Sequence, residues 1–303
     1  MTDPAIVPDS EAKPFLARLP ARISPYVQLM RLDRPIGAWL LFWPCAWSVA
    51  LAGGIRRDPW LFLWFAIGAV VMRGAGCVYN DIVDRELDVL VARTASRPIA
   101  SGRIRLATAW GLLFVLCVIG FVVLLQFNRV AAIVALLSLA PVAGYPFMKR
   151  ITWWPQAWLG LVFSWGALVG WAAVNRWISP VAVLLYAGSI AWVVGYDTIY
   201  ALQDREDDAL VGVRSSARRL GDYARLGVAL FYAIAVLIWA IAFWAVRPDP
   251  VALFALLPAA LQLAGQVVRL GPDSPDKALR VFRSNRTAGF LVFLACAVVG
   301  MTS

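Results

Sequence analysis

Long apolar stretches separated by short polar segments run along almost the whole chain. About nine of them approach the length of roughly 20 residues that a helix needs to cross a bilayer. They cover roughly residues 36–55, 59–80, 107–126, 130–147, 155–174, 180–202, 224–246, 250–269 and 287–302. We therefore predict an all-α membrane protein with about nine transmembrane helices.

The first residues of the chain are more polar and lack the small-residue cleavage site of a signal peptide. Arg18, Arg22 and Arg31 alternate there with leucine, isoleucine and phenylalanine, a pattern typical of an amphipathic helix on the membrane surface. No later segment has the composition of a linker between domains. We therefore divide the chain into an N-terminal segment, residues 1–34, and a single transmembrane domain, residues 35–303.

Composition supports the membrane class, with 61% hydrophobic and only 15% charged residues among 303. A net charge of +10 raises the question of nucleic acid. When the N-terminus is placed on the inner side and the spans alternate, most of the 28 Lys and Arg residues fall on that side. The charge is therefore explained by membrane orientation, and binding of nucleic acid is disfavoured.

Histidine is absent, and the four cysteines lie in apolar stretches without paired spacing. Imidazole acid–base chemistry, His ligation of haem, a disulfide framework and a zinc site are therefore disfavoured. Any reaction has to use carboxylate, Tyr, Lys or Arg side chains, or a metal ion.

The segment NDIVDRELD follows the second apolar stretch directly. On a continuing helix Asn80, Asp84 and Asp88 recur every fourth residue, and Asp81 lies three residues before Asp84, so all four share a face. Like charges at this spacing repel, and a partly dry setting strengthens the repulsion. A cation is therefore expected between them. Arg85 lies on another face, which leaves Mg²⁺ as the better candidate for these oxygen ligands.

A second acidic motif, DTIYALQDREDD, ends the sixth apolar stretch. Tyr200, Asp204 and Asp208 have the same four-residue spacing, and Asp197 lies two turns before Asp204 on the same stripe. Basic residues follow each motif: Arg93 and Arg97 after the first, and Arg214, Arg218 and Arg219 after the second. The two copies indicate an internal repeat in which two acidic helix ends and two basic loops face one cavity.

Two acidic clusters with arginines nearby suit a diphosphate, because Mg²⁺ bridges it to aspartates that would otherwise repel it. At the edge of the membrane, the other end of that ligand would be a lipid chain, which describes a polyprenyl diphosphate. Arg73 lies two turns deeper than Asn80 on the same face and is suited to an anionic acceptor. The alternatives are acidic helix ends on a solvated loop, and snorkelling of Arg73 to the interface.

The two motifs, NDxxDxxxD at residues 80–88 and YxxxDxxxD at residues 200–208, resemble those of the UbiA-type membrane-embedded aromatic prenyltransferases. The flanking stretches are most similar to the 4-hydroxybenzoate polyprenyltransferases of ubiquinone biosynthesis. Those stretches are LDRPIGAWLLFWPCAW, MRGAGCVYNDIVDRELD, RTASRPIASG, YPFMKRITWWPQAWLG and YDTIYALQDREDD. The resemblance implies about nine transmembrane helices around a central cavity.

The resemblance also implies roles for particular side chains. Asn80, Asp84 and Asp88 would bind one Mg²⁺ ion, with Asp81 as a further ligand or a partner of the ligands. Asp204 and Asp208 would bind a second ion. The diphosphate would contact Arg93, Arg97, Lys149 and Arg214, while Tyr200 would contact substrate and Asp197 the phenol of the acceptor. Lys149 also has a plainer interpretation as a positive anchor of a short loop.

The implied activity is Mg²⁺-dependent transfer of a polyprenyl chain to ring position 3 of 4-hydroxybenzoate by electrophilic aromatic substitution. Arg73 would orient the carboxylate of the acceptor, and Asp197 would polarise its hydroxyl. One alternative is a prenyltransferase of the same superfamily with a naphthoate, homogentisate or tetrapyrrole acceptor. Another is a cation-coupled transporter, which is disfavoured because the acids lie at the span ends and not at the midplane.

The partners expected from this assignment are the two substrates and membrane lipid. Helical spans and the bacterial character of the resemblance indicate the inner membrane of a bacterium. The N-terminus and active site would then be cytoplasmic and the C-terminus periplasmic.

Overall fold

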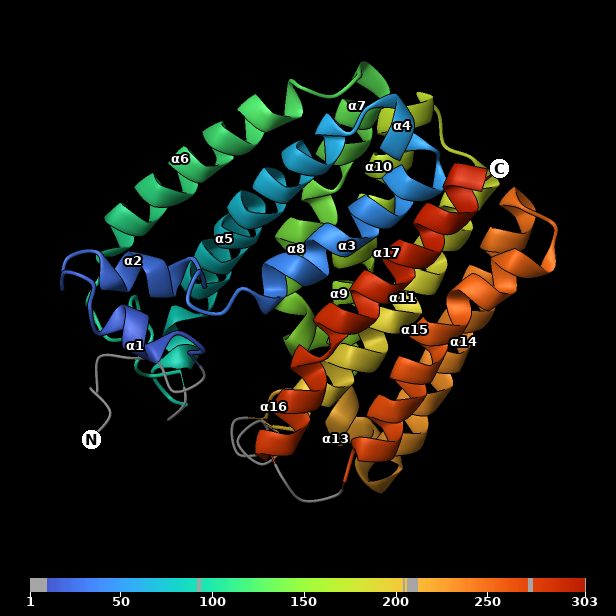
Figure 1. The fold of residues 1–303 in the computed structure, drawn as a ribbon. Coiled ribbons are helices and arrows are strands. Elements are labelled where there is room, and N and C mark those ends of the chain that lie inside the picture. The colour runs from blue at the N-terminus through green and yellow to red at the C-terminus, as the bar shows by residue number, and fades with distance from the viewer. Residues whose placement is uncertain (1–9, 92–93, 204, 206–211, 272–274, 303) are drawn as a thin grey trace. The chain divides into compact units, whose positions relative to one another are not determined.

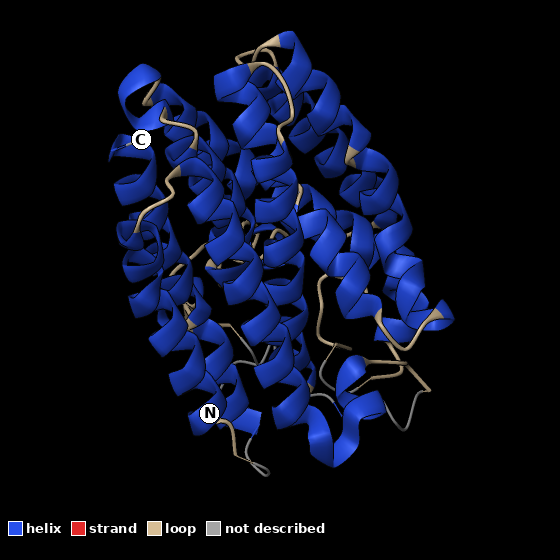
Figure 2. Cartoon of the chain, turned by 90° about the vertical axis from the view of Figure 1, so that its right-hand side faces the viewer, coloured by secondary structure: helices blue, strands red, loops and turns tan. Residues whose placement is uncertain are grey.

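Within the part of the chain that the computed structural model describes, every regular element is a helix (Figure 2). The described residues are 10–91, 94–203, 205, 212–271 and 275–302. Eight helical stretches among them are long and apolar enough to cross a membrane, and a shorter apolar helix, α3 (Ile36–Leu51), adds another. The prediction of an all-α membrane protein is confirmed, and each predicted apolar stretch coincides with one of these helical stretches.

Four of the spans are single uninterrupted helices (Figure 1). They are α6 (Leu106–Leu124), α11 (Pro180–Ala201), α15 (Pro250–Arg269) and α5 (Trp60–Asp88), which is the longest helix described. α11 and α15 begin with proline in their first turn, where the missing N–H costs no hydrogen bond.

Each of the other spans consists of two or more helical segments in succession. α7 (Arg129–Leu137) and α8 (Leu139–Ile151) meet at Ser138, and α9 (Pro155–Ser164) and α10 (Gly166–Asn175) meet at Trp165. α13 (Ser216–Leu220) and the 3₁₀ turn η1 (Gly221–Tyr223) lead into α14 (Ala224–Val246), and α16 (Pro275–Arg283) leads into α17 (Asn285–Thr302). A single turn, α4 (Gly54–Arg57), follows α3.

The described part of the N-terminal segment forms two short helices, α1 (Lys13–Leu16) and α2 (Ser24–Leu29). Residues 10–34 do not form one continuous amphipathic helix, because Pro20 lies between α1 and α2 and Pro25 lies in the first turn of α2, and proline interrupts a helix interior. The division of the chain into this segment and one transmembrane domain stays a prediction.

By contacts the chain divides into two compact units. The first comprises Met1–Trp39 and Ala66–Gln126, and the second comprises Leu40–Phe65 and Phe127–Ser303. The core of the first unit contains Leu29 of α2, Val78 and Ile82 of α5, and Leu116 of α6. The short helix α2 is therefore held on the membrane helices by apolar packing that ends close to the NDIVDRELD motif.

Helix α11 packs against α9, α14 and α16 in the second unit, while α15 packs against α14 and α17. Three indoles, Trp47, Trp192 and Trp239, lie fully buried among these helices, with ring centroids 5.0–6.3 Å apart. The indole N–H of Trp47 donates to the Gly289 carbonyl at 2.7 Å, and that of Trp192 donates to Asn285 at 3.0 Å. This core holds the helix that carries the second acidic motif.

Candidate functional site

Helix α5 continues to Asp88, so the spacing of the first motif does place its side chains on one face. The amide nitrogen of Asn80 donates to Oδ2 of Asp84 at 3.0 Å, one turn further along. Asp84 has no solvent-exposed surface, and Asp81 and Asp88 are buried as well. Three carboxylates thus lie close to the end of one membrane helix, where burial makes an uncompensated charge costly.

Two arginines neutralise part of this charge. Nη2 of Arg31 donates to both carboxylate oxygens of Asp81, at 2.8 and 3.0 Å. Nη1 of Arg97 donates to Asp88 at 2.9 and 3.0 Å and to Asp81 at 3.3 Å. Asp81 therefore links two guanidinium groups, one from before the first membrane helix and one from the loop after α5.

The contact of Arg31 was not predicted from the sequence, which indicated only a residue of a surface helix. Arg31 follows the C-terminus of α2 and has a positive φ of 58°, a conformation that is rare outside glycine. Its Nη1 also donates to the Gln28 carbonyl at 2.8 Å. The left-handed residue closes the helix and directs the guanidinium onto Asp81. The pairing joins residues 50 positions apart, so no local pattern reveals it.

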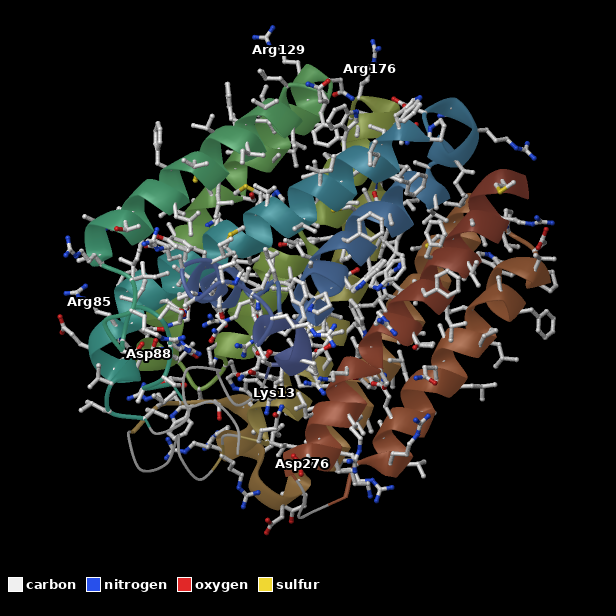
Figure 3. All side chains as sticks on the ribbon, turned by 60° about the vertical axis from the view of Figure 1, so that its left-hand side comes forward. Lys13, Arg85, Asp88, Arg129, Arg176 and Asp276 are labelled. Carbon is white, nitrogen blue, oxygen red and sulfur yellow. The ribbon has the colours of Figure 1, made fainter. Side chains whose placement is uncertain are left out.

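The chain turns back directly after α5, and this turn brings Arg97 to the acids. The hydroxyl of Thr94 donates to the Asp88 carbonyl at 2.9 Å, which satisfies one of the orphan carbonyls at the end of the helix. Arg85 lies on another face, as expected, and pairs with exposed Glu86 at 2.7 Å (Figure 3). The two arginines of this region thus have different environments: Arg97 is 17% exposed and Arg85 43%.

Arg73 lies deeper in α5 and is half-buried. Its guanidinium lies against Gly37 in the first turn of α3, and a Cβ atom at Gly37 would overlap with it. Only glycine at position 37 leaves room for Arg73 in this position. The first unit therefore brings together Asn80, Asp81, Asp84, Asp88 and Arg97, with Arg73 two turns deeper on the same helix.

The second motif begins inside α11, where Asp197 is half-buried between the buried residues Tyr196 and Thr198. The hydroxyls of Thr198 and Ser216 are hydrogen-bonded at 2.7 Å, and the Ser216 amide donates to Oε1 of Gln156 at 3.0 Å. The start of α13 is thereby fixed to both α11 and α9.

Lys149 and Arg214, predicted to bind the same ligand, are brought into contact although they are far apart in the sequence. The backbone N–H of Arg214 donates to the Lys149 carbonyl at 3.2 Å, and its guanidinium donates to the Ile151 carbonyl at 2.7 Å. Tyr200 packs on Phe282 of α16, with ring centroids 4.8 Å apart. The second unit therefore joins the segment of Arg214 to the end of α8, which carries Lys149.

Three predicted site residues, Arg93, Asp204 and Asp208, lie outside the described residues. Within the residues that are described, no three Asp, Glu, His or Cys side chains come close enough together to hold a metal ion by themselves. Asp81 and Asp88 accept hydrogen bonds from arginines, and Oδ2 of Asp84 accepts one from the Asn80 amide. The oxygen donors of the Asn80–Asp84 pair, with Asp88 beside them, suit a hard cation that completes its shell with other oxygens.

The described residues form helical spans, and buried carboxylates and arginines meet at the end of one of them, which defines a membrane-embedded helical protein with a charged site at a helix end. Residues 41–297 match the profile of the UbiA prenyltransferase family. The chain belongs to the UbiA prenyltransferase family and is an enzyme of that class.

Two curated relatives have the same name, "4-hydroxybenzoate polyprenyltransferase, mitochondrial". The protein of Aedes aegypti is 42% identical over 275 residues, which is 89% of this chain and 62% of the relative. The protein of Homo sapiens is 41% identical over 280 residues, which is 91% of this chain and 75% of the relative. The chain thus spans somewhat under two thirds of the mosquito protein and three quarters of the human one.

Solved structures show the same fold. A UbiA homologue from Aeropyrum pernix is 26% identical with a TM-score of 0.70, and the match covers 86% of this chain and 97% of the homologue. A homologue from Archaeoglobus fulgidus, described as bound to DMAPP and Mg²⁺, is 14% identical with a TM-score of 0.65. That match covers 91% of this chain and 99% of the homologue.

The prediction of a bacterial inner membrane is wrong, because the curated relatives are mitochondrial proteins of insects, a plant and mammals. The cytoplasmic and periplasmic sides assigned to the two termini and the active site are withdrawn with it. The length of the apolar stretches indicates that helices cross a bilayer, and the uneven distribution of Lys and Arg indicates their orientation across it. They carry no information about which membrane receives the protein.

Proposed function

We propose that this enzyme transfers a polyprenyl chain from polyprenyl diphosphate to ring position 3 of 4-hydroxybenzoate, a step of ubiquinone biosynthesis, and that it requires Mg²⁺. The proposal rests on the observation that buried carboxylates and guanidinium groups contact each other at the end of α5. This combination binds a metal–diphosphate complex, because cations bridge the acids to phosphate while arginines bind the remaining oxygens. The acceptor is inferred from the curated relatives, which have 4-hydroxybenzoate in their name.

For the metal, we assign Asn80, Asp84 and Asp88 to one ion and Asp204 and Asp208 to a second. Hard oxygen donors in this number fit Mg²⁺, which keeps some ligands from water or phosphate. When bound, the ions would supply Lewis-acid stabilisation of the departing diphosphate. The Archaeoglobus homologue, described with DMAPP and Mg²⁺, supports a metal in this fold.

Asp81 differs from the other acids of the motif in its contacts. Both of its oxygens accept from Arg31, and Oδ1 also accepts from Arg97. A carboxylate that is 1% exposed and shared by two guanidinium groups serves better as their anchor than as a metal ligand. We therefore assign Asp81 the task of holding Arg97 beside the acids.

The diphosphate is assigned to Arg97 and Arg93 after the first motif, and to Lys149 and Arg214 near the second. Guanidinium groups bind phosphate oxygens in pairs, and the bonds strengthen as negative charge develops on the leaving group. Because Arg97 is held by Asp81 and Asp88, it is positioned before substrate arrives.

The aromatic acceptor is assigned to two charged side chains within the spans. Arg73 would pair with the carboxylate, for which Gly37 leaves its guanidinium room. Asp197 would accept the phenol proton and raise the electron density of the ring carbon next to the hydroxyl, and Tyr200 would line the substrate site. The apolar spans would keep water from the allylic cation that forms when the C–O bond breaks.

Product formation by the purified protein in liposomes tests the proposal. Polyprenyl diphosphate and radiolabelled 4-hydroxybenzoate are supplied with Mg²⁺ or with a chelator. We expect label in a lipid-extractable product only when Mg²⁺ is present. Metal-independent product contradicts the metal site. A protein that binds the diphosphate with Mg²⁺ but leaves 4-hydroxybenzoate unlabelled contradicts the acceptor.

A further inference from the structure

Four exposed arginines lie in the second unit at the helix ends opposite its acidic motif. Arg56 and Arg57 end α4, Arg129 begins α7, and Arg176 follows α10. Arg176 comes four residues before the start of α11, while Asp197 lies about 25 Å further along that helix, at a rise of 1.5 Å per residue. These four charges are therefore separate from the candidate functional site.

Side-chain hydrogen bonds join the three connections that carry these arginines. Nη1 of Arg57 donates to Oδ1 of Asn175 at 3.2 Å, which places α4 beside the end of α10. Asn128 caps α7, and its amide nitrogen donates to the carbonyls of Ala172 and Ala173, each at 2.8 Å. The side chains thus gathered are called the arginine patch, which consists of Arg56, Arg57, Arg129 and Arg176.

The backbone of Arg176 has a left-handed conformation, with φ of 63°. Arg176 closes α10, and its amide donates to the Ala172 carbonyl at 2.9 Å. Glycine is the usual residue at such a helix end, because a Cβ atom makes the left-handed conformation less favourable. The chain has the less stable residue here, which indicates a use for its guanidinium group. Figure 3 shows the side chains of Arg129 and Arg176 pointing outward from this end of the unit.

The usual reason for basic residues at helix ends does not apply to this patch. Membrane proteins collect Lys and Arg on one side of the bilayer, and in this chain that side is the one with the acidic motifs. The patch lies at the opposite helix ends. Its three connections, residues 52–59, 125–129 and 175–179, contain four arginines and one acid, Asp58. The excess of positive charge therefore needs another explanation.

The surroundings of the patch have the character of the lipid headgroup region. Trp60 and Trp177, in two of the same connections, are 68% and 56% exposed, and exposed indoles at helix ends are typical of the membrane interface. On α7, Arg129 is followed at intervals of four residues by Ile133 and Leu137, which are 50% and 61% exposed. The three side chains share one face, with the charge at its end and apolar groups along it. A phospholipid has the same order of phosphate and acyl chain.

We propose that the arginine patch binds the phosphate of an anionic phospholipid, whose acyl chain lies along Ile133 and Leu137 of α7. Guanidinium groups form charged, paired hydrogen bonds with phosphate oxygens. The ligand is a lipid and not a soluble phosphate, because the charges stand at the end of an exposed apolar helix face. The inference goes beyond the proposed function, since it needs neither the metal ions nor prenyl transfer.

Native mass spectrometry of the full-length protein in detergent tests the proposal. Phosphatidylglycerol and phosphatidylcholine with identical acyl chains are titrated, and the Kd of each is measured. We expect tighter binding of phosphatidylglycerol, and Arg129→Gln and Arg176→Gly should each raise its Kd about fivefold, the contribution of one arginine near an anionic headgroup. Arg225→Gln is the matched control, because Arg225 is exposed in the first turn of α14, at the end of the unit that has the acidic motif. It should keep the wild-type Kd.

Arg176→Gly separates lipid binding from a structural role. Glycine relieves the left-handed backbone, so the melting temperature in lipid-free detergent should equal or exceed that of wild type while the affinity for phosphatidylglycerol falls. An excess of inorganic phosphate should leave the lipid bound, because it has no acyl chain.

Four results would overturn the inference. They are equal Kd values for the two lipids, an unchanged Kd in Arg129→Gln and Arg176→Gly, an equal loss of affinity in Arg225→Gln, and displacement of the lipid by inorganic phosphate. A lower melting temperature in Arg176→Gly together with weaker lipid binding would show a structural role instead. None of these results bears on the proposed function.

Discussion

Arg31 and Asp81 form a buried ion pair in which Nη2 lies 2.8 Å from Oδ1, and it joins the end of α2 to the acidic motif of α5. Arg31 is 9% exposed and Asp81 1%, so water screens neither charge effectively. Since Arg97 also contacts this carboxylate, at 3.3 Å, Asp81 orders both Arg31 and Arg97, and Arg97 is one of the arginines that we propose to bind the diphosphate. The acidic motif therefore depends on a residue that precedes every membrane span.

Replacing Asp81 by Asn should destabilise the protein and weaken diphosphate binding. Two buried guanidinium groups would lose their shared counter-charge, which costs about 3 kcal/mol in the free energy of unfolding. Thermal unfolding in detergent measures the loss. Glu86→Gln is the control on the same helix, since Glu86 is 82% exposed, and a surface ion pair is worth less than about 1 kcal/mol. Equal melting temperatures for the two variants would show that the buried pair contributes little.

A double-mutant cycle of Arg31→Gln and Asp81→Asn should reveal direct coupling. Because Arg31 donates directly to both carboxylate oxygens of Asp81, the second substitution should remove less stability than it does in wild type, by about 1–3 kcal/mol. Unfolding free energies of the four proteins give the coupling. Additive effects within error would mean that each residue acts through other contacts.

Asp84→Asn should abolish turnover while the protein remains folded. Asp84 is fully buried and accepts from Asn80, and the substituted amide keeps the shape while losing the charge that we propose binds the ion. We expect activity to fall by at least about a hundredfold, as for the loss of a metal ligand, and Asp204→Asn should behave in the same way. Activity and binding of Mn²⁺ by electron paramagnetic resonance are measured together.

The matched control for these carboxylate variants is Asp222→Asn, whose side chain is 98% exposed. It should keep wild-type activity and wild-type Mn²⁺ binding. Wild-type activity in Asp84→Asn and Asp204→Asn would exclude the two-metal proposal.

Gly37→Ala should weaken binding of the aromatic acid and spare the diphosphate. The added methyl group would overlap with the guanidinium of Arg73 and displace it. Loss of a charged hydrogen bond predicts a rise of about tenfold in KM for 4-hydroxybenzoate. Gly76→Ala is the control in α5, because a Cβ there meets no atom within 4 Å. A similar KM in both variants would argue against Arg73 as the carboxylate-binding residue.

Gln156→Leu should loosen the segment that carries Arg214. The Ser216 N–H would lose its buried acceptor, which costs about 1–3 kcal/mol, and KM for the diphosphate should rise as α13 shifts. Gln126→Leu is the control, since Gln126 is exposed just after the end of α6 and its side chain donates to the Val122 carbonyl of that helix. Hydrogen exchange of residues 213–218 would reveal the loosening, and unchanged protection would contradict it.

The sequence predicted those parts of the site that helical periodicity controls. Four-residue spacing placed Asn80, Asp84 and Asp88 on one face, and the Asn80–Asp84 contact confirms that placement. The same helical period predicted that Arg85 lies on another face of α5, where it pairs with Glu86. Lys149 and Arg214 were linked only through resemblance, and their contact required the folded chain.

The sequence by itself predicted about nine membrane helices and their approximate positions, and the described residues contain eight helical stretches long enough to cross a membrane and the shorter apolar helix α3. In lipid the backbone N–H and C=O groups of a single spanning segment have to form hydrogen bonds within that segment. An apolar stretch of sufficient length therefore predicts a helix. Only the tertiary structure decided which partners the charged side chains at the helix ends have. Arg31 pairs with Asp81, Arg97 pairs with Asp88, and two arginines lie beside the ring of Trp153. Except for Arg97 and Asp88, those contacts join residues far apart in the chain. The energy of all of them depends on burial and distance, which only folding sets.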